Sequence, residues 1–191
     1  MLKEAIKTLK TGDLVIFPTE TVYGIGCDIF NKRAVAKIYR LKKRARNKPL
    51  AVLVADQKQV SLLAKGISKT AHKLMRKYFP GPLTIVLRKK KSVPAIVTAG
   101  GKTIAVRCPD HPLTLKLLKQ FGPIVGTSAN LSGGKDPKTV REISRSLKNK
   151  VDCVLDGGKA KHGIPSTVVD ATSKTLKILR LGPVHIKKAG H

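Results

Sequence analysis

Hydrophobic and polar residues alternate along the chain in two patterns, one typical of helices and one typical of strands. Apolar residues at positions 2–9 recur every three or four residues, which predicts an amphipathic helix, and residues 14–17 form a short apolar run, which predicts a buried strand. The same patterns predict further helices at residues 34–41, 62–78 with a break near 66–68, 113–121 and 140–147. Further strands are expected at residues 50–54, 83–87, 103–106, 124–126, 151–155, 166–170 and 176–179.

After the first strand, residues 18–26 are rich in threonine and glycine and are expected to form a loop. Strands and helices alternate over most of the length, and the C-terminal part is richer in strands. This order is typical of an α/β protein. We therefore predict a single domain over residues 1–191, with a twisted, mostly mixed open sheet flanked by helices and a loose tail at residues 187–191.

The charge of the chain is strongly unbalanced. Its 191 residues include 39 lysines and arginines against 11 aspartates and glutamates, so the formal net charge is +28. A field of this sign and size attracts polyanions, which include nucleic acids, nucleotides and anionic membranes. Lysine-rich surfaces also occur in hyperthermophilic proteins, but those proteins gain glutamate as well, and acidic residues are scarce here. The charge therefore favours an anionic partner.

Other function classes are disfavoured by what the sequence lacks. Cys27, Cys108 and Cys153 are far apart and form no paired motif, which argues against a disulfide scaffold and against a zinc ribbon. The five histidines show no metal-ligand spacing, and His111 beside Pro112 is expected to start a helix. The N-terminus has no apolar signal core, and no apolar stretch approaches the ~20 residues that cross a bilayer. We therefore expect a cytoplasmic protein with no membrane partner.

Candidate chemistry lies in loops that carry hydroxyls, amides, glycines and cations. The segment PTETVYGIG at residues 18–26 follows a strand at once and has Thr19 and Thr21 on either side of Glu20. Such dense hydroxyls suit a small polar ligand such as an amino acid, or they cap backbone groups within a tight turn. In KKRARNKPL, residues 42–50, five of the first seven residues are cationic. A helix cap needs only one or two cations, so the surplus favours phosphate binding.

Two further segments follow late strands. TSANLSGG at residues 127–134 has small residues that let backbone N–H groups approach an anion, with Ser128 and Asn130 as side-chain donors. The alternative for this segment is a helix cap or a turn. Arg180 stands alone in an apolar strand and needs a partner, such as a carboxylate or a phosphate.

In their order and spacing these segments resemble the YrdC-type threonylcarbamoyl-adenylate synthase family, in its short form with a single YrdC-like domain. The likeness runs to Gly182, over nearly the whole chain. The pieces that carry it are PTETVYGIG, KKRARNKPL, FPGPLTIVL at 79–87, TIAVRCPDHP at 103–112, TSANLSG, DGG at 156–158 and GIPSTVVD at 163–170. This chain departs from many relatives at Ala45, where they have proline, and at Leu53, where they have histidine. We also expect it to be without the extra C-terminal domain of the longer relatives.

The resemblance implies an ATP-consuming nucleotidyltransferase. Such an enzyme condenses L-threonine, bicarbonate or CO2, and ATP into threonylcarbamoyl-AMP and pyrophosphate, for the threonylcarbamoyl-adenosine modification of tRNA. Lys42 and Arg44 are implied to be catalytic. The implied ATP-binding residues are Lys42, Arg44, Arg46, Thr103, Ser128, Ala129, Asn130 and Arg180. The implied threonine-binding residues are Thr21, Tyr23, Arg107, Thr127 and Ser166. Mg²⁺ is expected on the phosphates, with no protein ligand assigned.

The implied reaction pushes two anions together, so it demands charge neutralisation and in-line positioning, which cations and hydroxyls supply. The expected partners are the three substrates and a downstream tRNA threonylcarbamoyl-transferase complex, and direct binding of tRNA or double-stranded RNA stays open. Two alternatives also stay open. One is an RNA-binding module without chemistry, favoured by the charge but not by an aromatic content of 4%. The other is a carbamoyl-adenylating domain of the hydrogenase-maturation type.

Overall fold

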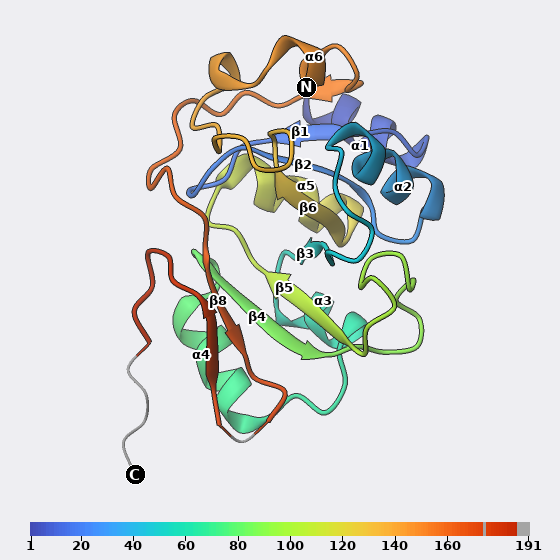
Figure 1. The fold of residues 1–191 in the computed structure, drawn as a ribbon. Helices are drawn as coiled ribbons and strands as arrows, with labels where there is room; N and C mark the ends of the chain where they lie inside the picture. Colours follow the sequence, from blue (N-terminus) through green and yellow to red (C-terminus); the bar gives the residue numbers. More distant parts are fainter. Residues whose placement is uncertain (174, 187–191) are drawn as a thin grey trace.

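A computed structural model of the chain describes residues 1–173 and 175–186 (Figure 1), and the tail expected at residues 187–191 lies outside the described residues. The helices are α1 (Leu2–Lys10), α2 (Lys32–Leu41), α3 (Gln57–Leu63), α4 (Lys69–Tyr78), α5 (Pro112–Phe121), the 3₁₀ turn η1 (Val140–Glu142) and α6 (Arg145–Lys148). The strands are β1 (Val15–Phe17), β2 (Gly24–Asp28), β3 (Ala51–Leu53), β4 (Leu83–Arg88), β5 (Thr103–Arg107), β6 (Ile124–Ser128), β7 (Cys153–Val154), β8 (Thr167–Asp170) and β9 (Lys177–Arg180).

Within the described residues the strands form one nine-stranded sheet in the order β7-β1-β2-β6-β3-β5-β4-β8-β9. The pairs β1–β7, β3–β5 and β4–β8 are parallel, and the other neighbouring pairs are antiparallel. The sheet is therefore mixed. It is also open, because the strand order begins at β7 and ends at β9 and does not close into a barrel. Both features confirm the fold class that the sequence predicts. None of the helices in the described part combines the length and the apolar character that a membrane crossing needs.

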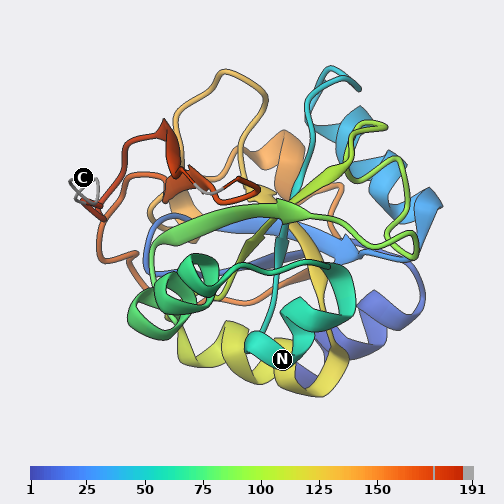
Figure 2. The ribbon, with the colours of Figure 1, turned by 90° about the horizontal axis from the view of Figure 1, so that it is seen from below.

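Helices cover both faces of the sheet because its strands are apolar on both sides. Ile16 of β1 lies in the apolar cluster that contains Ile38 of α2. Its neighbour Phe17 points to the opposite face and lies in the cluster that contains Leu9 of α1 and Leu117 of α5. Figure 2 shows α1 and α5 on one side of the sheet and α2 on the other. The core thus holds the sheet rigid beneath the loops that connect its strands.

One strand was not expected from the sequence. The segment predicted as a loop over residues 18–26 ends in β2, which pairs with both β1 and β6. Its glycines are required by close packing, since a Cβ at Gly26 would come within 2.9 Å of the ring of Phe17 and would also meet the carbonyl oxygen of Val125. Glycines in a sequence usually indicate a turn, which is why a loop was predicted. In β2 they allow neighbouring strands to approach closely.

Two helices differ from their predicted extents. α3 begins five residues before the expected position 62, because Asp56 caps it and accepts a hydrogen bond from the backbone N–H of Gln59 at 2.9 Å. The helix expected at residues 140–147 is split into η1 and α6, since the backbone at Ile143 and Ser144 is extended. The first difference concerns an element end, where local capping decides the outcome.

Candidate functional site

A cavity of about 440 Å³ lies over the middle of the sheet, where loops from several strands meet. Part of its floor consists of small residues in register across neighbouring strands. Gly126 of β6 lies opposite Ala51 of β3, which lies opposite Ala105 of β5. Because these residues have little or no side chain, they leave room for a ligand directly above the sheet.

The wall of this cavity carries far more positive than negative charge. Five of its lining residues are cationic, namely Lys42, Arg44, Lys48, Arg107 and Arg180. Asp136 is the one carboxylate among the described residues that line it. An anionic ligand is therefore the complement that this cavity favours.

Lys42 is buried at the C-terminal end of α2, with 1% of its surface exposed. Its ammonium donates to the carbonyl oxygens of Ser128 and Asn130 and, at 2.9 Å, to Oδ1 of Asn130. Because an ammonium has three hydrogens, all of them are used. Burial, followed by the charge of Arg44, lowers the pKa of Lys42 to about 8. Lys42 thus ties α2 to the loop after β6, and a phosphate oxygen reaches Nζ only if one of these acceptors is released.

Asn130 organises the loop that follows β6. Its Oδ1 accepts a hydrogen bond from Ser128 Oγ at 2.8 Å, and its Nδ2 donates to the carbonyl oxygen of Gly134 at 2.6 Å and to Asp136 Oδ1 at 3.0 Å. The side chains of Ser128 and Asn130 are therefore occupied with the loop itself. The main chain of the following residues, including Gly133, lines the cavity, and main chain at this position suits an anion.

Arg44 is held at the same end of the cavity by backbone carbonyl oxygens. Its Nε donates to the carbonyl oxygen of Lys48 at 3.2 Å, and its Nη2 donates to that of Pro49 at 2.8 Å. Burial lowers the pKa of Arg44, which records the cost of holding a charged group there. The guanidinium is thus fixed in place without a carboxylate to neutralise it.

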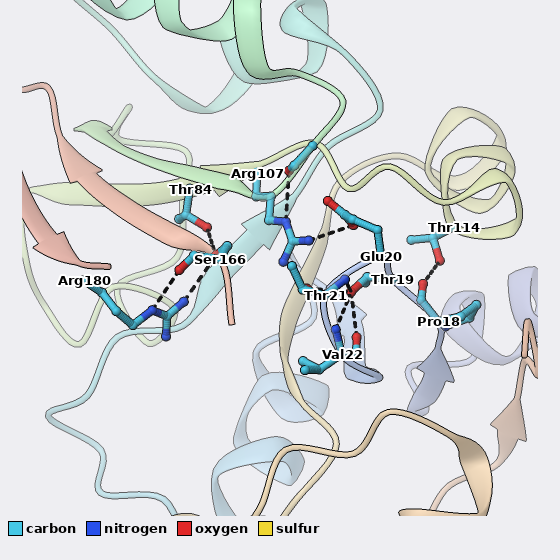
Figure 3. Close-up of polar contacts among 11 residues, drawn as sticks. Pro18, Thr19, Glu20, Thr21, Val22, Thr84, Arg107, Thr114, Ser166 and Arg180 are labelled. Atoms are coloured by element: carbon cyan, nitrogen blue, oxygen red, sulfur yellow. Dashed lines mark hydrogen bonds and ion pairs between the residues drawn. The ribbon is translucent and has the colours of Figure 1, made fainter. Parts of the chain in front are cut away.

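Thr19 and Thr21 form a buried hydroxyl pair on the cavity wall, with 2.8 Å between their Oγ atoms. Thr19 also donates its hydrogen to the carbonyl oxygen of Val22 at 2.6 Å (Figure 3). A hydroxyl has one hydrogen to donate, so Thr21 must be the donor within the pair. The lone pairs of Thr21 Oγ are then left to accept a hydrogen bond from the N–H or O–H of a ligand.

Arg107, at the end of β5, forms a buried ion pair with Glu20, whose Oε2 lies 2.8 Å from Arg107 Nη2. The two side chains are 9% and 6% exposed. Arg107 Nε donates to the carbonyl oxygen of Gly81 at 3.3 Å (Figure 3). Arg107 forms part of the cavity wall, and Glu20 lies behind it.

Ser166 joins three strands on the opposite wall. Its Oγ lies 2.7 Å from Thr84 Oγ1 of β4 and accepts from Arg180 Nη2 at 3.2 Å, while Arg180 Nε donates to its carbonyl oxygen at 2.9 Å (Figure 3). Arg180 was expected to need a partner such as a carboxylate or a phosphate. Within the described residues its hydrogen-bond partners are the hydroxyl and the carbonyl oxygen of Ser166. Burial lowers the pKa of Arg180.

The structure brings most of the predicted site residues together. Those that line the cavity are Thr21, Lys42, Arg44, Arg107, Thr127, Ser128, Asn130, Ser166 and Arg180. These residues come from loops and strands far apart in the sequence, and a single site requires that they meet in one cavity.

Four other predicted residues have different surroundings. Arg46 and Thr103 are exposed, and Thr103 lies at the start of β5 opposite Arg88. Ala129 is buried, and its N–H donates to the carbonyl oxygen of Tyr23. Tyr23 is fully buried, its hydroxyl lies 2.7 Å from the carbonyl oxygen of Gly158, and it accepts from the N–H of Gly157 at 3.0 Å. Contacts of these four with a ligand stay predictions.

Sequence reasoning missed Thr84 and Asp136, which also line the cavity, and it included Lys48 only within the cationic run of residues 42–48. Thr84 carried a signal, because it is the one hydroxyl in the otherwise apolar run LTIVL and is 4% exposed. Asp136 carried no signal that separates it from other charged loop residues.

Comparisons with known proteins identify the family of this chain. The protein-family model Sua5/YciO/YrdC, described as telomere recombination, matches residues 7–182. A protein of Vibrio vulnificus named threonylcarbamoyl-AMP synthase is 37% identical, over 95% of this chain and 98% of the relative. One of Pyrococcus abyssi with the same name is 39% identical over 94% of this chain, and the chain spans about half (53%) of that relative's length. The crystal structure of P. abyssi Sua5 complexed with L-threonine matches with a TM-score of 0.91 and 39% identity, covering 94% of this chain and 53% of that one.

The surroundings of Tyr23 predict a structural role for its hydroxyl. We expect Tyr23→Phe to lower the free energy of unfolding by about 1–3 kcal/mol, because the hydrogen bonds of the buried hydroxyl to Gly157 and Gly158 are both lost. Denaturant unfolding measures this. Tyr78→Phe, at the partly buried end of α4, serves as the control and should change stability by less than about 0.5 kcal/mol. Equal effects of the two substitutions would contradict the assignment.

The lowered pKa of Lys42 predicts that the free energy of unfolding depends on pH. Its pKa is about 8 in the folded protein against an ordinary value of 10.5 for a lysine in water, so between these pH values the unfolded chain binds more protons and stability rises with pH. Relative to Lys42→Met, which has no ammonium, we expect the free energy of unfolding of the wild type to rise by up to about 3 kcal/mol from pH 8 to 10.5. Denaturant unfolding of both proteins across this range is the measurement. If the difference in free energy of unfolding between the wild type and Lys42→Met stayed constant or fell over this range, the pKa of Lys42 would not be lowered in the folded protein.

Proposed function

The chain belongs to the Sua5/YciO/YrdC family, and from this premise we propose that it is a threonylcarbamoyl-AMP synthase. The proposed reaction consumes L-threonine, bicarbonate or CO2, and ATP, and it yields threonylcarbamoyl-AMP and pyrophosphate. The observation that carries the proposal is the single cavity whose wall combines five cations with the Thr19–Thr21 hydroxyl pair.

The two parts of the cavity suit two substrates. The side formed by Lys42, Arg44 and residues 128–134 offers cations and main chain, which suit the phosphates of a nucleotide. The side formed by Thr21 and Arg107 offers a hydroxyl acceptor and a guanidinium, which suit the ammonium or hydroxyl and the carboxylate of an amino acid. Threonine carries all three of these groups.

The chemistry follows from this arrangement. The free amine of threonine attacks CO2 and loses a proton, which gives a carbamate. A carbamate oxygen then attacks the α-phosphorus of ATP, the bond from this phosphorus to the bridging oxygen of the β-phosphate breaks, and pyrophosphate leaves. Both reactants are anions, so preset cations lower the barrier by neutralising the charge that collects between them.

The described residues do not form a resident magnesium site. No group of three histidine, cysteine, aspartate or glutamate side chains in the described part of the chain could hold a metal ion. Asp136, the carboxylate on the cavity wall, already accepts a hydrogen bond from Asn130. We therefore propose that Mg²⁺ enters only as part of the ATP complex, held by phosphate oxygens and water.

Residue 53 lines the cavity and concerns the part of it that we propose for the amino acid. Leu53 lines the cavity beside Gly126 and supplies an apolar contact where many relatives have histidine, whereas Ala45 is exposed. We propose that threonine's methyl group packs against apolar wall of this kind. The downstream tRNA threonylcarbamoyl-transferase complex, a cytoplasmic setting and direct tRNA binding belong to the same proposal and are supported by the family and by the charge of +28.

ATP–pyrophosphate exchange by the purified protein tests the function. We expect exchange only when L-threonine and bicarbonate are both present. Exchange with carbamoyl phosphate in their place would favour the hydrogenase-maturation chemistry. Salt-sensitive RNA binding without any exchange would favour the RNA-binding module.

Arg44 tests the phosphate side of the site. We expect Arg44→Ala to lower kcat/KM for ATP about 10- to 100-fold, because a charge-assisted hydrogen bond of about 1.5–3 kcal/mol is lost. The matched control is Arg40→Ala, which removes an exposed arginine from the last turn of α2 and should change kcat/KM less than about threefold. Pyrophosphate release gives both values, and equal losses would refute a specific role for Arg44.

Thr21 tests the amino acid side. We expect Thr21→Val to raise the KM for L-threonine about 10-fold or more, because its lone pairs no longer accept from the ligand, with little change in the KM for ATP. Thr70→Val, an exposed position on α4, is the control. An unchanged KM for L-threonine in Thr21→Val would remove Thr21 from the substrate contacts.

A further inference from the structure

Glu20 has no role in the reaction described above, although it is one of the most buried charged groups in the described part of the chain. We propose that Glu20 is a positioning residue, whose carboxylate holds the guanidinium of Arg107 toward the amino acid and away from the nucleotide phosphates. This inference rests on the proposed function, since it concerns the amino acid side of the same cavity.

The contacts of Arg107 leave one edge for a ligand. Its Nη2 faces Glu20 Oε2 at 2.8 Å, and its Nε donates to the carbonyl oxygen of Gly81. Figure 3 shows the remaining nitrogen of the guanidinium on the side of Thr21. Glu20 and Gly81 therefore act from one side, and the third nitrogen is presented to the cavity beside the hydroxyl that we assign to the amino acid.

The ion pair is poorly explained by stability alone. Its two charged atoms approach closely without the alignment of a hydrogen bond, and neither Oε1 nor Oε2 of Glu20 has a hydrogen-bond partner among the described residues. A buried carboxylate with unsatisfied oxygens costs free energy, and a buried ion pair often stabilises a fold less than apolar residues of the same size. A functional reason for Glu20 is therefore favoured over a structural one.

Arg107 needs such a restraint because of its neighbours. It shares the cavity with Lys42, Arg44 and Arg180, and their side of the cavity is assigned to a triphosphate. A guanidinium on a flexible stem would be drawn to those phosphates once ATP binds. The fixed negative charge of Glu20 opposes that movement, and because Glu20 lies behind the wall it does not compete with the substrate carboxylate for the cavity edge.

Glu20→Gln tests this inference, since it keeps the shape of the side chain and removes its charge. We expect the KM for L-threonine to rise about 10-fold or more, as for the loss of one charge-assisted contact, while the KM for ATP stays the same or falls. Glu4→Gln, on the exposed face of α1, changes the net charge equally and should leave both values unchanged.

An analogue separates positioning from a general loss of structure. L-Threonine amide lacks the carboxylate that Arg107 would bind, so its affinity, measured by calorimetry, should be equally weak in the wild type and in Glu20→Gln. Binding of L-threonine should differ between them about 10-fold. Glu20→Asp, which keeps the charge on a shorter stem, should retain more L-threonine affinity than Glu20→Gln. If Glu20→Gln does not fold, Glu20→Asp takes its place in the comparison with the wild type.

The outcomes are distinct. Equal losses for L-threonine, its amide and ATP in Glu20→Gln would mean a structural role and would overturn the inference. An unchanged KM for L-threonine in a folded variant would overturn it as well. Both results leave the proposed function intact, because the wild type would still make the product. A wild type that neither binds L-threonine nor makes threonylcarbamoyl-AMP would refute the proposed function instead.

Discussion

The site depends on cations that are held by backbone carbonyl oxygens, and among Lys42, Arg44, Arg107 and Arg180 only Arg107 forms an ion pair with a carboxylate within the described residues. Lys42 donates to the carbonyl oxygens of the loop after β6, and Arg44, Arg107 and Arg180 each donate to at least one backbone carbonyl oxygen. A carbonyl oxygen fixes the direction of a charged group but does not neutralise it. The positive charge therefore stays available to a ligand, and burial, which lowers the pKa values of Lys42, Arg44 and Arg180, leaves it poorly solvated until an anion arrives.

This arrangement links the fold to the chemistry. The mixed sheet provides a rigid floor, and small residues in register across β6, β3 and β5 keep that floor low. The loops above it are fixed by their own hydrogen bonds, so the cations would need little rearrangement when charge builds up in the proposed adenylation. Arg107 is the exception, because Glu20 faces it as a countercharge, and this difference distinguishes the side of the cavity that we propose for the amino acid from the side that we propose for the nucleotide.

The sequence was sufficient for the class of fold and for most of the residues that were predicted to share one cavity, but not for how that cavity is assembled. Apolar periodicity located α1, α2 and the strands near their observed positions, because burial on one or both faces governs these elements. β2 was missed because Gly24 and Gly26 are required by packing against Phe17, which only the strand pairing reveals. The burial of Tyr23 and its hydrogen bonds to residues 156–158 depend on tertiary contacts that the local sequence does not show. The floor of small residues is likewise set by register between strands, which no local pattern encodes.

Mass spectrometry of the product formed from ¹³C-labelled bicarbonate, L-threonine and ATP is the most direct measurement of whether this cavity joins an amino acid to a nucleotide. We predict a single product with the mass of threonylcarbamoyl-AMP and one ¹³C atom, formed together with pyrophosphate. Hydrolysis of ATP without this product, or an adenylate of threonine that carries no ¹³C, would contradict a cavity that holds a carbamate beside the α-phosphate.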